Sequence, residues 1–352
     1  MSTKIKKSFA CAAVQDFNLN KKFTKNYAPK AGDVAIFRVL EANGSYVTDS
    51  QGINRNIFDD DLVMLTFGNR YATNQVEGYV PNAPVKECHL LGRGGVAGVL
   101  KSANATMKTE PPVLELVGYA VNESGQVINT IRSHELTDFS PAMIRSKVIL
   151  SVGSSMDSGK TTTAAYLCGG LSKAGYTTAY IKLTGTAFPK DARFVQDRGA
   201  DFITDFTHFG YPSTFLCEHN ELLNLYQSLI NIAQEAVSPD YILVEIADGI
   251  LQRETAMLLR DCLFMSTVHG VILSCGDSLG VPAALQILES LHIYPFAISG
   301  LFTASELLIE EAQHIISTPV LRLNDLLNAN SIHYMNVSGY KASDLLLMQE
   351  RA

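Results

Sequence analysis

A loop of small and polar residues, set between an apolar stretch and a helix-compatible stretch, constrains the fold of this chain most. The apolar run 148–152 predicts a short buried strand. Glycine, serine and aspartate follow, and the tetrad GKTT at 159–162 then begins a run that is compatible with a helix through residue 174. Strand, small-residue loop, Gly-Lys-Thr and helix is the order of a phosphate-binding P-loop. The sequence therefore favours nucleotide binding, with a coincidental loop-to-helix turn as the alternative.

The parts of this loop have distinct expected roles. Its backbone N–H groups and the positive end of the following helix face a polyphosphate. We expect Lys160 to reach the β- and γ-phosphate oxygens of ATP and the hydroxyl of Thr161 to bind Mg²⁺. The usual spacing puts the first glycine at Ser154, whereas here it comes one residue earlier, at Gly153. The residues expected to hold the nucleotide are Gly153, Ser154, Ser155, Asp157, Ser158, Gly159, Lys160, Thr161 and Thr162.

Length and composition limit the remaining possibilities. A chain of 352 residues is longer than one hydrophobic core usually serves, so two domains are expected. The net charge of −7 argues against a nucleic-acid partner, and no apolar run reaches the roughly 20 residues that a membrane span needs. The six cysteines are scattered without a CxxC pair, which is typical of a reduced cytoplasmic protein. The oligomeric state is open, with a homodimer as one alternative.

Three parts follow one another along the chain. Residues 1–30 are polar and rich in lysine and asparagine, and we expect an arm with little structure of its own. Residues 31–140 hold short β-rich runs separated by turn residues, which predicts a smaller all-β domain, either a barrel or a sandwich. Strand–helix alternation over 146–352 predicts an α/β domain with a doubly wound, mostly parallel P-loop sheet. The stretch 137–145, which contains a proline, is the expected hinge.

The α/β part has recognisable candidate elements. Strands are predicted at 147–152, 178–183, 241–246, 270–274, 295–299 and 319–323, and helices at 160–174, 220–236, 253–262, 278–291 and 305–315. Gly169 and Gly170, inside the first of these helices, each cost about 1 kcal/mol relative to alanine. Close packing of that helix on the sheet is the expected reason for both glycines.

Several charged residues follow predicted strands, where ligands bind in a doubly wound sheet. Lys182 ends the second strand and is expected to contact phosphate or substrate, one strand away from the P-loop if the two strands are neighbours; a lysine that extends to the rim is the alternative. Asp191 is a candidate Mg²⁺ or water-shell ligand. Four apolar residues lead to Glu245, the first choice for an acid beside Mg²⁺, with Asp248 second. The expected catalytic residues are Lys160, Lys182, Asp191 and Glu245, and the expected metal ligands are Thr161, Glu245 and Asp191.

Further stretches have structural explanations that compete with functional ones. The glycine-rich run 92–98 lacks a βαβ context, so a tight turn is favoured over an anion site. The tripeptide 69–71 puts a cation beside an aromatic ring and is expected to be a packing corner. We expect His208, among aromatic residues, to be structural rather than an acid–base group. The stretches 274–278 and 300–305 occupy the places of base recognition, and the lack of a guanine-reading N/TKxD tetrad favours ATP.

The second half of the chain resembles the dethiobiotin synthetase and molybdopterin-guanine dinucleotide B protein branch of P-loop proteins. The matching stretches are GSSMDSGKTT, YIKLTGT and VEIADG. This half is also similar to the P-loop half of bacterial proteins related to D-glutamate N-acetyltransferase. The resemblance implies a Mg-nucleotide held by Lys160, Thr161 and Glu245, with a small substrate near Lys182. Ser155 replaces an aspartate of that branch, and the N-terminal β region matches neither relative.

Three functions are consistent with these observations. The leading hypothesis is an ATP- and Mg²⁺-dependent enzyme that transfers the γ-phosphoryl group to a small-molecule acceptor, as a kinase or a carboxylate-activating ligase does. The first alternative is a nucleotide-gated assembly or metal-delivery NTPase, in which hydrolysis drives a conformational switch. The second is a CoA-dependent acyltransferase whose P-loop holds the phosphates of coenzyme A.

Overall fold

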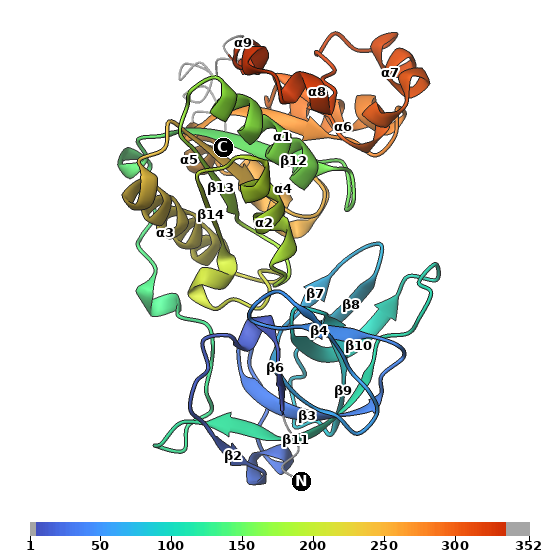
Figure 1. Cartoon of the computed structure of the whole chain (residues 1–352), viewed down its shortest axis with the longest axis vertical. Coiled ribbons are helices and arrows are strands. Elements are labelled where there is room, and N and C mark those ends of the chain that lie inside the picture. The colour runs from blue at the N-terminus through green and yellow to red at the C-terminus, as the bar shows by residue number, and fades with distance from the viewer. Residues whose placement is uncertain (1–4, 336–352) are drawn as a thin grey trace. The chain divides into compact units, whose positions relative to one another are not determined.

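The chain divides into two units in the computed structural model, which describes residues 5–335 (Figure 1). Residues 1–4 of the expected arm and 336–352 of the expected P-loop domain lie outside the described residues. The first unit comprises the chain up to Leu136 together with Gly185–Lys190 and Phe206–Leu216. The rest of the chain forms the second unit, so two loops of the second half of the sequence belong to the first unit.

The first unit is a β-barrel with additional strands. The barrel strands, in the order in which they pair, are β6 (Leu62–Phe67), β3 (Val34–Glu41), β11 (Val113–Val121), β9 (Glu87–Gly92) and β10 (Val96–Ala103). β10 pairs back onto β6 in parallel, which closes the circuit. Alternate side chains, among them Phe37, Leu65 and Tyr119, are fully buried inside. The predicted all-β region is confirmed, and of its two alternatives the structure shows the barrel.

Residues 5–30 are part of this unit, so the expectation of an arm with little structure is wrong for them. The remaining strands of the unit are β1 (Lys6–Lys7), β2 (Asn18–Asn20), β4 (Tyr46–Thr48), β5 (Asn54–Asn56), β7 (Arg70–Tyr71) and β8 (Val76–Tyr79). β1 pairs with β6, and β2 pairs with β11. Cys11 and Val14, which lie between β1 and β2 in the sequence, are buried in a cluster with Val34, Ile36 and Met64. A few apolar side chains thus suffice to fix a polar segment whose periodicity is too weak to predict strands.

The second unit contains a parallel six-stranded sheet. Its strands, in spatial order, are β14 (Phe202–Asp205), β13 (Thr178–Lys182), β15 (Tyr241–Glu245), β12 (Lys147–Gly153), β16 (Val268–Ser274) and β17 (Ala297–Ser299). Every pair in it is parallel. The chain begins at β12 in the middle, reaches one edge, returns through β15 and then continues to the other edge. This order confirms the predicted doubly wound α/β fold.

Helices connect these strands. They are α1 (Lys160–Lys173), α2 (Lys190–Arg198), α3 (His219–Val237), α4 (Arg253–Arg260), α5 (Cys262–Ser266), α6 (Gly280–Ser290), α7 (Glu306–Gln313), α8 (Leu323–Leu326) and α9 (Ile332–Met335). Side chains of α1 and α2 share one core with Ile149, Tyr180 and Leu243 of the sheet. Because parallel crossovers are right-handed, the connections that run in the opposite direction, through α3 and α5, cover the other face.

Several segments differ from the sequence-based expectations. The stretch 319–323 contributes a single parallel bridge, from Val320 to Ile298, rather than a strand. The elements α2 and β14 were not predicted, because a glycine- and proline-containing stretch precedes the first and aromatic residues surround the second. The stretch 137–145 contacts α3, whose Gln227 and Gln234 side chains accept hydrogen bonds from the backbone amides of Ser140 and Arg145. Its expected role as a hinge stays a prediction.

Candidate functional site

Two glycines give the loop between β12 and α1 its shape. Gly159 precedes α1 with a φ of +101°, a left-handed conformation that glycine adopts without strain. A Cβ atom on Gly153 would lie 2.3 Å from Ser158 Oγ and 2.9 Å from Lys160 Cγ. The displaced glycine at 153 therefore leaves room for the loop and for the lysine stem to fold over the end of β12.

Lys160 lies at the first position of α1 and is 6% exposed. Its Nζ donates a hydrogen bond of 2.8 Å to the carbonyl oxygen of Ser155, so the ammonium group lies over the loop. Burial lowers the pKa of Lys160, and the carboxylates of Glu245 and Asp248 oppose that shift. A cation held among loop amides in this way is suited to a polyanion.

Thr161 and Glu245 are brought together, as the proposed metal site requires. β15 is the direct neighbour of β12, and Ser151 is opposite Glu245 in the register. Thr161 Oγ1 donates a 3.1 Å hydrogen bond to Glu245 Oε1, and Glu245 is 1% exposed. A hydroxyl and a carboxylate side by side at the head of a P-loop helix are oxygen donors of the kind that Mg²⁺ takes beside nucleotide phosphates. The donor set therefore fits the predicted Mg-nucleotide.

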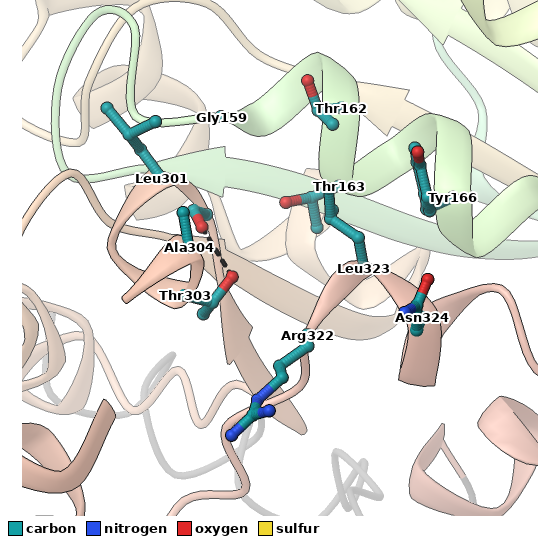
Figure 2. A pocket seen from close by; sticks show the side chains of 11 residues that line it. Gly159, Thr162, Thr163, Tyr166, Leu301, Thr303, Ala304, Arg322, Leu323 and Asn324 are labelled. Atoms are coloured by element: carbon teal, nitrogen blue, oxygen red, sulfur yellow. Dashed lines mark hydrogen bonds between the residues drawn. The ribbon is translucent and has the colours of Figure 1, made fainter. Parts of the chain in front are cut away.

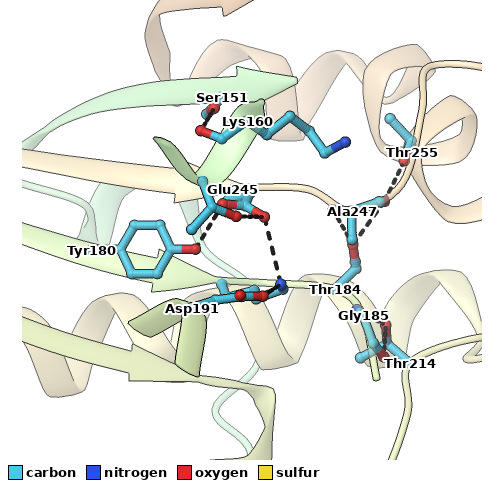
Figure 3. A network of polar contacts seen from close by, with 12 residues as sticks. Ser151, Lys160, Tyr180, Thr184, Gly185, Asp191, Thr214, Glu245, Ala247 and Thr255 are labelled. Atoms are coloured by element: carbon cyan, nitrogen blue, oxygen red, sulfur yellow. Dashed lines mark hydrogen bonds and ion pairs between the residues drawn. The ribbon is translucent and has the colours of Figure 1, made fainter. Parts of the chain in front are cut away.

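A buried polar network surrounds the same carboxylate (Figure 3). The Tyr180 hydroxyl donates to Glu245 Oε2 at 2.8 Å. Lys182 Nζ lies 3.6 Å from Glu245 Oε1 and also forms an ion pair with Asp191. Burial alone would lower the pKa of Lys182, but Glu245 and Asp191 outweigh it and the pKa is raised. Burial and the neighbouring Glu245 carboxylate raise the pKa of Tyr180, which keeps its hydroxyl proton in place.

The strand order corrects the expected position of Lys182. The sequence predicts Lys182 one strand away from the P-loop if β12 and β13 are neighbours, but β15 lies between them. Lys182 is opposite Glu245 in the register of β13 and β15, so it reaches the P-loop region through that acid. Asp191, in the first turn of α2, faces Lys182. Its suggested role as a metal ligand stays a prediction.

Hydroxyl groups fix the chain directly after Glu245. The backbone N–H of Ala247 donates to Thr184 Oγ1 at 2.9 Å, and the Ala247 carbonyl accepts from Thr255 Oγ1 at 2.8 Å (Figure 3). Gly249 follows, and a Cβ atom there would lie 2.7 Å from the carbonyl oxygen of Ser154. The end of β15 and the P-loop are therefore held at close distance.

The other predicted loop residues line this bend or its surroundings. The Ser154 amide donates to the Ser274 carbonyl at 2.9 Å, and the Ser158 carbonyl accepts from the Leu301 amide at 3.0 Å. Within residues 5–335, the buried Ser158 hydroxyl has no hydrogen-bond partner. Asp157 has a φ of +60°, a turn conformation that aspartate tolerates.

A pocket of about 390 Å³ adjoins the head of α1 in the second unit (Figure 2). Gly159, Thr162 and Tyr166 line it from the P-loop side. Segments far along the chain complete its walls, with Gly300, Leu301, Thr303, Ala304, Arg322, Leu323 and Asn324. The expected base-recognition stretch 300–305 thus contributes to it. Tyr166, Arg322 and Asn324 were not predicted, because only the fold brings them beside the P-loop.

Other candidate residues lie elsewhere in the structure. His208 is exposed in the first unit, where its backbone carbonyl accepts from the Arg132 guanidinium. In the glycine run 92–98, residues 93–95 form the turn between β9 and β10, and the rest of the run belongs to these two strands. Among residues 5–335, no three His, Cys, Asp or Glu side chains gather as a metal site. In the same part of the chain, no helix combines the length and the apolar character needed to span a bilayer.

Comparisons with known proteins give partial likenesses. No family model and no curated protein matches the chain. FtsY from Mycoplasma mycoides is 15% identical over 56% of this chain and 67% of its own, with a TM-score of 0.37. A ParA family ATPase from Chlorobium tepidum is 12% identical over 53% and 93%, with a TM-score of 0.34. The kinase domain of the Escherichia coli tyrosine kinase ETK is 13% identical over 46% and 69%, with a TM-score of 0.30. At these TM-scores the likenesses carry no weight, and the fold rests on the topology described above.

Proposed function

We propose that the protein binds ATP with Mg²⁺ at the loop between β12 and α1 and transfers the γ-phosphoryl group to a small-molecule acceptor. The observation that carries the proposal is the hydrogen bond of 3.1 Å between Thr161 and Glu245, two oxygen donors from neighbouring elements at the head of α1. The bound Mg²⁺ would neutralise charge on the phosphates. The resemblance to dethiobiotin synthetase and the B protein supports this reaction class.

Residues of the P-loop, of α1 and of the neighbouring strands each have an expected role in this reaction. Lys160 and the loop amides hold the phosphates, and Glu245 fixes the Thr161 hydroxyl. Thr162 and Tyr166 line the pocket proposed to receive the base. Lys182 is bound by Asp191 and Glu245, so contact with an acceptor would require that Lys182 exchange Asp191 for the acceptor's anionic group. Catalysis of this kind is mainly positioning and charge neutralisation.

The Lys160→Ala variant tests the proposal. We expect nucleotide turnover to fall by about 100-fold or more, because a preorganised cation on the phosphates is lost. Lys173→Ala, an exposed lysine in the last turn of the same helix, is the matched control and should retain full turnover. Calorimetric titration with ATP, GTP and acetyl-CoA, with and without Mg²⁺, separates a kinase or ligase from the alternatives. Unchanged turnover in a folded Lys160→Ala protein would contradict the proposal.

A further inference from the structure

A second pocket, of about 550 Å³, lies within the first unit. Tyr46 of β4, Arg70 of β7, Leu91 of β9 and Arg93 of the following turn contribute to its walls. The loop between β10 and β11 adds residues 107–112, and the segment that returns from the second half of the sequence adds Phe188 and Lys190. The volume is in the range of pockets that hold small molecules.

The lining of this pocket is positively charged. Arg70, Arg93, Lys108 and Lys190 are present, and Glu110 is the one acid among the lining residues that the structure describes. The whole chain carries a net charge of −7, so the charge of the pocket lining is opposite in sign to that of the chain. Concentrated positive charge in a concave surface raises the local concentration of anions.

Arg93 is held in a defined orientation. Its guanidinium lies 4.6 Å from the centroid of the Tyr46 ring, and Nη1 donates to the Tyr46 hydroxyl at 3.3 Å. The Arg93 carbonyl accepts from the Thr48 amide at 2.8 Å, which fixes the backbone. A guanidinium has five donors in a planar fork, so one bond to Tyr46 leaves capacity for a carboxylate or phosphate.

Lys190 lies in the segment Gly185–Lys190, which packs closely against the rest of the first unit. A Cβ atom on Gly94 would lie 1.8 Å from the Ala187 carbonyl oxygen, so only glycine admits the segment at this point. The Ala187 amide donates to the Pro212 carbonyl at 2.9 Å. Lys190 Nζ lies 5.6 Å from the Phe188 ring. Gly94, in the run that predicts a tight turn, thus admits the segment that brings Phe188 and Lys190 to the pocket.

Apolar and aromatic groups complete the lining. Val76, Leu90, Leu91, Pro111 and Pro112 supply apolar surface, and Tyr46 and Phe188 supply rings. Rings beside cations are suited to a planar ligand that carries a negative group, since the ring packs on apolar surface while the charge meets the cations.

We propose that this pocket is a binding site for a small planar anion, an aromatic or heteroaromatic ring that carries a carboxylate or a phosphate. Arg93 and Lys190 bind the anionic group, and Tyr46, Phe188 and the apolar lining receive the ring. The site is independent of the P-loop and does not rest on the proposed function.

Calorimetry of the whole 352-residue chain with 2-naphthoate, 2-naphthyl phosphate and the neutral 2-naphthamide tests the site. We expect both anions to bind and the amide to bind about tenfold more weakly, since it lacks the charge-assisted hydrogen bonds. Arg93→Gln and Lys190→Gln should each weaken anion binding about tenfold, with Lys86→Gln, an exposed lysine outside the pocket, as the unchanged control. The ratio between the two anions shows which anionic group the site prefers.

Four results would overturn the proposal. The first three are equal binding of the amide and the carboxylate, no binding of either anion, and anion binding that survives both pocket substitutions in folded protein. The fourth is loss of anion binding in the Lys160→Ala variant. Lys160→Ala should leave binding of all three probes unchanged. If that variant abolishes it, the anions bind at the P-loop and the pocket is not their site. Because nucleotide turnover is measured separately, failure of the pocket and failure of the proposed function are distinguishable.

Discussion

Glu245 is the residue on which the candidate site depends, because three other side chains converge on a carboxylate that is only 1% exposed. The hydroxyls of Thr161 and Tyr180 donate to its two oxygens, and the Lys182 ammonium lies 3.6 Å away. A buried carboxylate is costly unless its oxygens are bound. Its position at a strand end was predictable from four apolar residues followed by an acid.

Tyr180 was not predicted, because a tyrosine within an apolar strand is indistinguishable from a core residue. The available signal was its spacing of two residues from Lys182, which puts both side chains on one face of β13. That signal becomes useful only when β15 is known to be the neighbour of β13. Sequence patterns thus indicated the acids and cations, whereas the neutral group that orients Glu245 required the strand order.

Tyr180→Phe should weaken the response to Mg²⁺. The substitution removes the donor that orients Glu245 Oε2, and loss of such outer partners typically costs about 10- to 100-fold in metal affinity. The measurement is the Mg²⁺ concentration that gives half-maximal nucleotide turnover at fixed ATP. Tyr176→Phe, at an exposed tyrosine that precedes β13, is the control. An unchanged Mg²⁺ requirement in Tyr180→Phe would show that the hydroxyl does not position the acid.

Lys182→Met should destabilise the protein by about 3 kcal/mol at pH 8, because it leaves Glu245 and Asp191 without their shared cation. The pKa of Lys182 is raised in the folded state, so the ion pair contributes fully below the ordinary value of 10.5. Its contribution is lost as the pH rises through the raised pKa. Urea unfolding of both proteins at increasing pH checks this, and a difference in unfolding free energy that grows above pH 10.5 would contradict it.

At the scale of elements, the two glycines of α1 allow close packing as predicted, but against other segments than the predicted sheet. Gly169 and Gly170 were expected to allow close packing on the sheet. A Cβ atom on Gly170 would instead lie 2.0 Å from the carbonyl oxygen of Leu326 in α8, and one on Gly169 would lie 2.7 Å from the Arg198 carbonyl at the end of α2. Close approach was predictable from two glycines in a helix, but the partners were not, because neither α2 nor α8 was predicted.

Gly170→Ala should destabilise the second unit despite the better helix propensity of alanine. The gain of about 1 kcal/mol in propensity is smaller than the cost of displacing a backbone carbonyl 2.0 Å away, for which about 2–3 kcal/mol is typical. Thermal and urea unfolding measure the change. Gly276→Ala, where the new Cβ atom meets nothing within 4 Å, should change the unfolding free energy by less than about 0.5 kcal/mol. A stabilised Gly170→Ala protein would contradict the assignment of this contact.

The whole molecule is organised differently from the order of its sequence. Local patterns predicted both folds, since apolar periodicity and turn residues are local properties. They did not predict that Gly185–Lys190 and Phe206–Leu216 belong to the barrel unit, because that depends on contacts between residues far apart in the sequence. Gly210 shows such a contact, since a Cβ atom on it would lie 1.7 Å from the Thr130 carbonyl.

A fragment of residues 1–136 should therefore fold poorly by itself. It contains every barrel strand but lacks two segments that pack against Gly68 and Gly94 and bind the Arg132 amide through Phe209. Heteronuclear NMR of the fragment should show less amide dispersion than expected for a complete barrel, and its thermal unfolding should be broad. Addition of the same fragment to the remaining chain, 137–352, should restore a sharp transition. A cooperative, well-dispersed fragment would show that the two segments are dispensable.

The contact between Gly94 and Ala187 limits which parts of this chain can be replaced by recombination. Recombination usually exchanges one continuous stretch of coding sequence, but the first unit comprises three separate stretches of the chain. A recombination that swapped the first 136 residues would leave Ala187 facing a foreign surface without the glycine that admits it. We therefore expect that Gly94 and the segment that contains Ala187 can be exchanged only together.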